Sequence, residues 1–265
     1  MNILFIGDVV GNPGREAIKS LLPGLRKEFD LDFVVVNAEN AAGGSGITAK
    51  IAQELFDCSV DVLTSGDHIW KKKEIFELIK TERRILRPNN FPSTAPGAGY
   101  NVFTSSKGQK VGVICVLGRV FMDALECPFK TTMAAVEAIT KETNVILVDI
   151  HAEATSEKVA LGWYLQGKVS AVLGTHTHIQ TADERILPEG TAYLTDAGMT
   201  GPYDSVIGRR VEDVMERFLT HVPVRFEVAE GNVQLCGAVV EIDERTGHAQ
   251  KITRLQRKLA NTPWI

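Results

Sequence analysis

The sequence lacks several features that would identify a class of protein at once. Its four cysteines form no CxxC pair, and three of them lie in or beside apolar segments, which favours buried free thiols in a reducing cytosol. No apolar run reaches the roughly 18 residues that a membrane span needs, and no leader-peptide pattern follows Met1. These absences predict a cytoplasmic protein without a membrane segment.

Clustered positive charge is also scarce. The formal net charge is −4 and the pI is near 5.9, whereas nucleic-acid-binding domains usually carry a concentrated basic excess. The only short basic run, Lys71 to Lys73, fits a solvated helix face. We therefore expect no strong nucleic-acid-binding surface.

Short apolar runs recur along the chain, and several end in a polar or ionisable residue. They cover residues 2–8, 33–40, 60–68, 111–119, 145–152, 170–178 and 192–198. Helical periodicity lies between many of them, at residues 15–29, 49–56, 72–80, 131–140 and 156–165. This alternation predicts an α/β protein with largely parallel strands.

The pattern changes after Gly201. Residues 222–231, 232–243 and 249–258 have the pattern of strands separated by turns, with little helix, which predicts an antiparallel meander near the C-terminus. Because the 265 residues contain no low-complexity linker or internal repeat, we expect one domain with two sheets over residues 1–265. Exposed strand edges of the meander favour a homo-oligomer such as a dimer.

Acidic and imidazole side chains follow the predicted strands. In open α/β sheets ligands bind outside the carboxyl ends of the strands. The candidates at these ends are Asp8, Glu39, Asn40, Asp67, His68, His151, His176 and His178. Carboxylates and imidazoles without thiolates suit a divalent metal such as manganese, iron or zinc. The candidates outnumber the ligands of one four-coordinate ion, so two ions that share a carboxylate would use them best.

Each candidate also has an ordinary structural explanation. A helix cap would account for Asp8, and a turn would account for Glu39 and Asn40. Taken alone, His151 is more often a hydrogen-bonded core histidine than a ligand. Separate structural explanations do not account for the shared position of these residues, because four of the six histidines lie at strand ends among three acids.

Seven motifs give the chain a family resemblance. They are FIGDVVGNPGR, NAENAAGG, LGRVFM, HAEATSEK, GTHTH, TADERILP and TDAGMTGPYDSVIG, and they extend over nearly the whole chain. The sequence resembles the calcineurin-like metallophosphoesterases, and more closely their bacterial YmdB-like branch. The resemblance implies a four-layer αββα sandwich and a dinuclear metal-dependent phosphodiesterase. Its substrates would be 2′,3′- or 3′,5′-cyclic nucleotides and related phosphoesters.

The same resemblance implies two metal shells that share Glu39. The first shell would consist of Asp8, Glu39, Asn40 and His178. The second shell would consist of Glu39, Asp67, His151 and His176. The two divalent ions would be iron or manganese, with zinc or magnesium as alternatives. A metal-activated hydroxide would attack phosphorus, and His68 would act as general acid on the leaving oxygen, unless it only orients a neighbour.

Two positions depart from the wider superfamily pattern. The first motif has Asp8-Val9-Val10 in place of Asp-x-His, and Asn40 would replace the missing histidine ligand, as it does in the YmdB-like branch. The third motif is Gly-Asp-His in place of Gly-Asn-His, so Asp67 adds a negative charge to the centre. A less positive centre should acidify its water less, and it should also attract an anionic phosphate less strongly.

Two arginines and one glycine-containing segment are further candidates for the site. Arg119 and Arg15 would contact phosphate through their planar donor groups, or would instead form structural ion pairs. Residues 196–202 would shape the rim of the pocket. A metal-dependent amidohydrolase is a second enzyme class, but its His-x-His motif after the first strand is absent. A regulatory or RNA-processing partner protein, with a weakly active or structural metal site, is the alternative to the enzyme.

Overall fold

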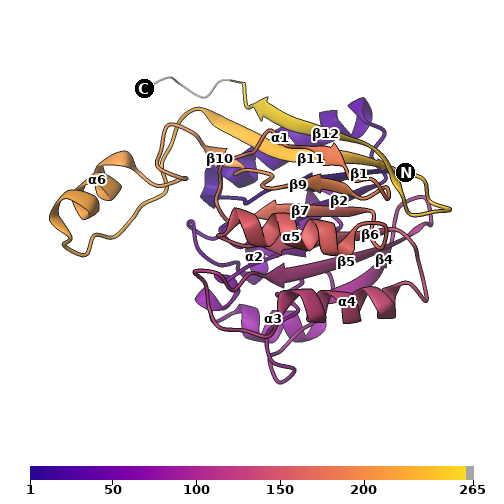
Figure 1. Ribbon diagram of the computed structural model, residues 1–265. Helices are drawn as coiled ribbons and strands as arrows, with labels where there is room; N and C mark the ends of the chain where they lie inside the picture. Colours follow the sequence, from indigo (N-terminus) through magenta and orange to yellow (C-terminus); the bar gives the residue numbers. More distant parts are fainter. Residues whose placement is uncertain (261–265) are drawn as a thin grey trace.

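The computed structural model of the protein describes residues 1–260 and contains two six-stranded sheets (Figure 1). The first sheet has the order β10 (Gly201–Pro202), β11 (Val233–Ile242), β1 (Asn2–Ile6), β2 (Phe33–Asn37) and β3 (Val62–Thr64), with β12 (Ala249–Lys258) also paired to β11. The second has the order β4 (Tyr100–Thr104), β5 (Lys110–Leu117), β6 (Ile146–His151), β7 (Ala171–Thr175), β9 (Ala192–Leu194) and β8 (Arg185–Ile186).

Strand direction follows the predicted division of the chain. Within the first sheet β1, β2 and β3 run parallel, and within the second β5, β6, β7 and β9 do so. The C-terminal strands β11 and β12 form the expected antiparallel pair, and β11 joins β1 in antiparallel register. The meander therefore completes the first sheet and does not form a separate unit.

Alternating side chains along the strands produce a four-layer sandwich. In β1, Leu4 and Ile6 pack in a core with helices α1 (Gly11–Glu28), α2 (Ala49–Asp57) and α3 (Ile75–Thr81). Ile3 and Phe5 face the other way, into a core between the sheets. The far side of the second sheet packs against α4 (Pro128–Ile139) and α5 (Thr155–Leu165). The predicted αββα architecture is confirmed.

The prediction of little helix after Gly201 is wrong. Residues Val211–Thr220 form helix α6, and residues 222–231 contain only an isolated bridge in place of the predicted strand. Apolar residues recur three and four positions apart in α6, and acids occupy its first turn, which is the pattern of a helix. Pro223 lacks an N–H for a strand ladder. We call residues 203–230, which extend from the body, the α6 arm (Figure 1).

The cysteine prediction is confirmed for pairing and only in part for burial. All four thiols are free; Cys115 and Cys236 are buried, but Cys58 and Cys127 are partly exposed. Among the helices within residues 1–260, none has both the length and the apolar surface to cross a bilayer.

Candidate metal centre

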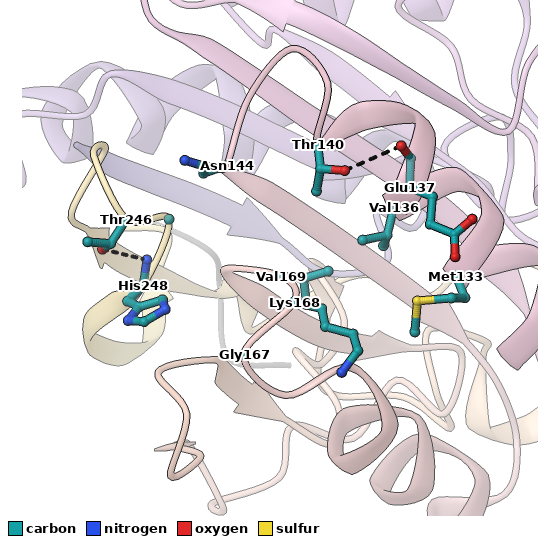
Figure 2. A pocket seen from close by; sticks show the side chains of 11 residues that line it. Met133, Val136, Glu137, Thr140, Asn144, Gly167, Lys168, Val169, Thr246 and His248 are labelled. Atoms are coloured by element: carbon teal, nitrogen blue, oxygen red, sulfur yellow. Dashed lines mark hydrogen bonds between the residues drawn. The ribbon is translucent and has the colours of Figure 1, made fainter.

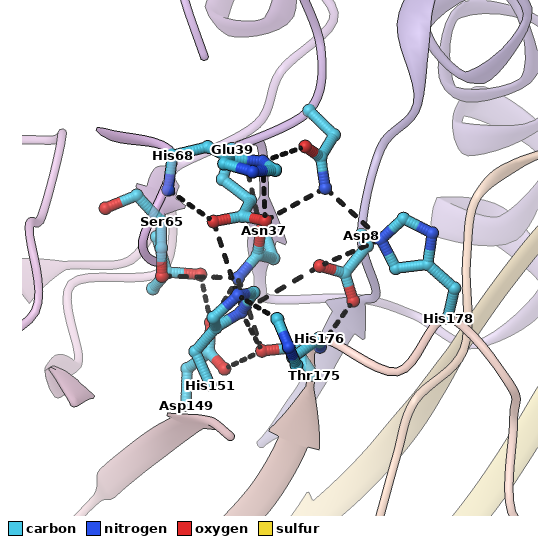
Figure 3. Close-up of polar contacts among 12 residues, drawn as sticks. Asp8, Asn37, Glu39, Ser65, His68, Asp149, His151, Thr175, His176 and His178 are labelled. Carbon is cyan, nitrogen blue, oxygen red and sulfur yellow. Dashed lines mark hydrogen bonds and ion pairs between the residues drawn. The ribbon is translucent and has the colours of Figure 1, made fainter. Parts of the chain in front are cut away.

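The carboxyl ends of strands from both sheets meet at one place, and all eight predicted side chains gather there. Figure 3 labels six of them, which are Asp8, Glu39, His68, His151, His176 and His178. Strands β1, β2 and β3 supply Asp8, Glu39, Asn40, Asp67 and His68, which lie in the loops that follow them. Strand β6 ends with His151, and the loop after β7 carries His176 and His178. Residues far apart in the chain are thus brought together by the sheet topology.

One half of the site is a compact group of four residues. Glu39, Asp67, His151 and His176 each offer a ligand atom within 4.8 Å of the others. His151 Nε2 lies 3.2 Å from Asp67 Oδ1 and 3.3 Å from Glu39 Oε2. His176 Nδ1 lies 3.0 Å from the same nitrogen. Two carboxylates and two imidazoles aimed at a common point fit a divalent cation.

Gly66 makes this convergence sterically feasible. A Cβ atom at this position would lie 2.2 Å from His151 Cδ2 and 2.3 Å from Glu39 Oε2. Any side chain here would displace the ligand atoms, so glycine is required immediately before Asp67.

The other half of the site surrounds Asp8. His178 Nε2 lies 3.8 Å from Asp8 Oδ1, and its Nδ1 donates to the Ile207 carbonyl at 2.9 Å, so Nε2 carries no proton in the neutral ring and can ligate a metal. Asp8 Oδ1 is buried and has no hydrogen-bond partner among residues 1–260. A buried carboxylate oxygen without a donor is costly, and a cation would satisfy it. Asp8 does not cap α1, whose N-cap is Val10.

Asn40 lies between the two halves, but the nitrogen of its amide, and not the oxygen, faces the other ligand groups. Its Nδ2 donates to Glu39 Oε1 at 2.9 Å and lies 3.2 Å from His178 Nε2, while its Oδ1 lies 2.7 Å from His68 Nδ1. A metal would require the oxygen in the place of the nitrogen. A half-turn of the amide exchanges the two atoms, so the position fits the predicted ligand.

Burial and neighbouring charged groups shift the pKa values of the ionisable residues at the centre. Burial raises the pKa of Asp8 to about 6, against the influence of His178 and His151. Burial also opposes ionisation of Asp67, but the hydrogen bond with His151 and the neighbouring imidazoles bring its pKa well below the usual range. For His151 the penalty of burial is outweighed by the charge of Glu39, so its pKa is well above normal. The imidazolium thus balances carboxylates that a metal cation would otherwise neutralise.

His68 is suited to contact a substrate. Its backbone N–H donates to Glu39 Oε2 at 3.2 Å, which fixes the residue beside the ligands. Its Nε2 lies 3.6 Å from Asp67 Oδ2, and the side chain is 31% exposed. His151, by comparison, has no exposed surface. The geometry therefore allows His68 to exchange a proton with a bound molecule.

Sequence reasoning missed a layer of polar residues behind the ligands. Thr175 Oγ1 donates to Asp149 Oδ1 at 2.7 Å and accepts from His151 Nδ1 at 2.9 Å. Asp149 Oδ2 accepts from Asn37 Nδ2 and from Thr64 Oγ1, at 3.0 and 2.5 Å. The network holds the His151 tautomer that leaves Nε2 for a metal. Polar residues inside otherwise apolar strands are the signal that could have revealed it.

A buried ion pair shapes the loop that carries the two histidines. Lys158 Nζ lies 2.7 Å from Asp196 Oδ2, and both side chains are essentially inaccessible. The same oxygen accepts from the Thr177 N–H and Oγ1. His176 and His178 have φ values of 97° and 65°, which non-glycine residues adopt at a cost that the loop contacts must offset. Asp196 thus supports the site from within, which corrects its predicted place on the rim.

Neither predicted phosphate-binding arginine is among the residues that line the cavity at this centre. Arg15 donates to Glu54, to the Ala41 carbonyl and to Asn12, so its guanidinium is engaged in structural contacts. Arg119 is exposed, and its backbone N–H, not its side chain, is the group bound to Glu157. The structural alternative therefore explains Arg15 better, and no contact supports a role for Arg119 in phosphate binding.

A cavity of about 720 Å³ opens over the metal centre. Glu39, Asn40, His68, His176 and His178 line one side, and residues of the α6 arm line the other. A second cavity, of about 360 Å³, lies between α4 and the turn before β12 (Figure 2). There Thr140 donates to the Glu137 carbonyl and Thr246 accepts from the His248 backbone, so these polar groups are engaged locally. None of the predicted site residues lines this second cavity.

Comparison with known proteins shows the family of this chain. The YmdB-like protein family matches residues 4–255. A 2′,3′-cyclic-nucleotide 2′-phosphodiesterase of Bacillus subtilis is 49% identical over 255 residues, which are 96% of each chain.

Two solved structures have the same fold. A hypothetical protein from Thermus thermophilus has a TM-score of 0.91 and 40% identity, covering 99% of this chain and 100% of its own. A phosphatase from Mycoplasma pneumoniae has a TM-score of 0.91 and 34% identity, covering 97% of this chain and 93% of its own.

Proposed function

The chain belongs to the YmdB-like protein family and is a hydrolase of phosphoesters, and on this basis we propose that it is a two-metal phosphodiesterase acting on 2′,3′-cyclic nucleotides. The observation that carries the proposal is the position of Glu39, whose carboxylate lies between the Asp67–His151–His176 group and the Asp8–Asn40–His178 group. A bridging carboxylate is the feature that two adjacent cations need. The carboxylate, imidazole and amide donors favour iron or manganese over softer metals, with zinc or magnesium as alternatives.

The metals would supply charge and an activated nucleophile. Two bound divalent ions would acidify the attacking water, hold the phosphate oxygens and offset charge that develops at phosphorus. Asp8, Glu39 and Asp67 would contribute carboxylate ligands, and Asn40, His151, His176 and His178 would contribute neutral ones. 3′,5′-Cyclic nucleotides and simpler diesters are related substrates of the same chemistry.

His68 would donate the proton that the leaving oxygen requires. Donation would start from the imidazolium, whose Nε2 proton would go to the leaving oxygen. The ring would then be left as a neutral imidazole. General acid catalysis of this kind typically contributes 10²–10⁴-fold.

Metal analysis and a substrate panel test the proposal. The panel contains 2′,3′-cyclic AMP, 3′,5′-cyclic AMP and bis(p-nitrophenyl) phosphate, with Glu39→Gln as the variant and the exposed Glu77→Gln as its control. We expect two metals per chain and turnover of the 2′,3′-cyclic substrate in the control, and loss of both in Glu39→Gln. Bound metal without turnover, even with added manganese, would favour the regulatory alternative.

A second variant separates proton donation from orientation. His68→Ala should lose about 100-fold or more on the cyclic nucleotide, whose leaving alkoxide needs a proton. It should lose far less on bis(p-nitrophenyl) phosphate, because nitrophenolate leaves without one. Equal losses on the two substrates would assign His68 an orienting role.

We also propose a cytoplasmic location, which the four free thiols support.

A further inference from the structure

The α6 arm is fixed beside the metal ligands at its base. Arg209 donates to the carbonyls of Gly43 and Gly44, in the loop that follows β2. The Ile207 carbonyl accepts from His178 Nδ1 at 2.9 Å, so the arm and a predicted metal ligand share a hydrogen bond. Any molecule bound at the centre therefore lies next to this arm.

The arm and the centre form two walls of one cavity of about 720 Å³, which is the size of a small-molecule site. The centre supplies the polar wall. The arm supplies an apolar wall from Ile207, Val214, Phe218 and Phe226, together with two cations, Arg209 and Arg217. A ligand that fills the cavity must pair a charged end with a flat or apolar end.

Helix α6 presents two different faces. Arg217 and Phe218 lie three and four residues after Val214, so all three share the face that lines the cavity. Phe218 is 69% exposed there, although it is an aromatic side chain beside a catalytic centre. Leu219, the next residue, is 76% exposed and does not line the cavity. Phe218 faces the cavity and Leu219 does not, so the two residues form a matched pair for experiments.

We propose that the cavity-facing side of the α6 arm binds the nucleobase of the cyclic nucleotide, with Phe218 stacked on the face of the base. This inference rests on the proposed function, because the phosphate must occupy the metal centre. With the phosphate there, the ribose and base extend into the remainder of the same cavity. Aromatic side chains stack on every base, and Arg217 adds donors for its nitrogen and oxygen atoms. Phe218 is thus a specificity-determining residue and takes no part in the chemical step.

Steady-state kinetics on the metal-loaded full chain test this inference. The substrates are 2′,3′-cyclic AMP and methyl ribofuranoside 2,3-cyclic phosphate, which lacks the base. Phe218→Ala should raise KM for the nucleotide about tenfold at unchanged kcat, and leave both constants for the base-free substrate unchanged. Phe218→Trp, which retains a stacking ring, should keep the wild-type KM. Leu219→Ala should match the wild type on both substrates.

The outcomes distinguish the inference from the proposed function. If the wild type hydrolyses neither cyclic phosphate, the proposed function fails and the inference fails with it. If the wild type hydrolyses both but Phe218→Ala affects them equally or not at all, only the inference is overturned. If Leu219→Ala behaves as Phe218→Ala does and both variants change the mass measured by light scattering, α6 is a contact between copies of the chain, which also overturns it.

Discussion

Asp67 adds a carboxylate to this centre where the resembling superfamily has an asparagine. Its carboxylate lies 3.2 Å from His151 Nε2 and 3.6 Å from His68 Nε2, so it contacts both a predicted ligand and the predicted acid. The amide of an asparagine would keep the oxygen and remove the charge. If the proposed two divalent ions bind beside three carboxylates, the charge at the centre is lower by one unit than it would be with asparagine.

Asp67→Asn should therefore raise phosphodiesterase turnover at neutral pH with metal saturating, by on the order of threefold, because a more positive centre acidifies water more and attracts the phosphate more strongly. Initial rates on 2′,3′-cyclic AMP over a manganese titration measure this. Glu153→Gln is the matched control, since Glu153 Oε2 lies 3.2 Å from His176 Nε2 but the residue is not a predicted ligand. Equal or lower turnover in Asp67→Asn would refute the charge argument.

Asp8 is costly to the fold when no cation is present. Its pKa rises from 3.8 to about 6 because the group is buried, so the ionised form is disfavoured in the folded chain. In chelator, Asp8→Asn should be more stable than the wild type by up to about 3 kcal/mol above pH 6. This gain in stability should shrink as pH falls through 6 and vanish near 3.8, the ordinary pKa of aspartate, because Asp8 is then protonated in both the folded and the unfolded wild type.

Urea unfolding between pH 5 and 8 measures this difference. The exposed Asp30→Asn serves as control. With manganese present, the wild type should become more stable than Asp8→Asn. A stability difference that is independent of pH would contradict the assignment of the cost to the buried charge.

At the scale of elements, the strands position the ligands through polar residues at or near their ends. Asn37 and Thr64 end β2 and β3, Thr175 ends β7, and all three donate to Asp149 of β6. The bonds from Asn37 and Thr64 cross from the first sheet to the second, whereas most of the contact between the sheets is apolar. The polar bonds thus set how the two strand ends face each other at the site.

Thr175→Val should lower metal affinity or turnover about 10–100-fold, because the methyl group cannot accept from His151 Nδ1 and the ring loses its fixed tautomer. Thr175→Ser retains the hydroxyl and should restore most of the loss. Isothermal titration with manganese, alongside kinetics, separates this effect from a general loss of fold. If valine and serine behave alike, the hydroxyl does not position His151.

At the scale of the molecule, three apolar cores hold the layers together without the metal ligands. Removing metal should therefore abolish activity while far-UV circular dichroism stays unchanged. Tm should fall by on the order of 5 °C, the loss expected when a ligand that binds only the folded state is withdrawn. Activity that survives exhaustive chelation would refute a metal-dependent reaction.

The homo-oligomer remains a prediction for light scattering to test. Its proposed contact, the edge of β12, carries Lys251, Arg254 and Arg257, and charged side chains on an edge strand oppose pairing with another chain.

The chain sequence was sufficient for the layered α/β fold and for the eight residues of the centre. Strand ends can be read from apolar runs, and parallel topology brings these ends to one edge whatever the details of packing. The missed helix α6 was readable as well, since its periodicity and acidic first turn lie within ten residues. It was concealed by the strand-like segments that follow it.

Tertiary structure alone decided the remainder. The bonds from Asp149 to Asn37 and Thr64 join positions 112 and 85 residues apart, and no local pattern records which buried polar groups will meet. The same holds for the cavity between the centre and the α6 arm. A sequence determines which side chains can ligate, donate or stack, because those are properties of the residue, whereas distance and direction between remote residues exist only after the sheets have packed.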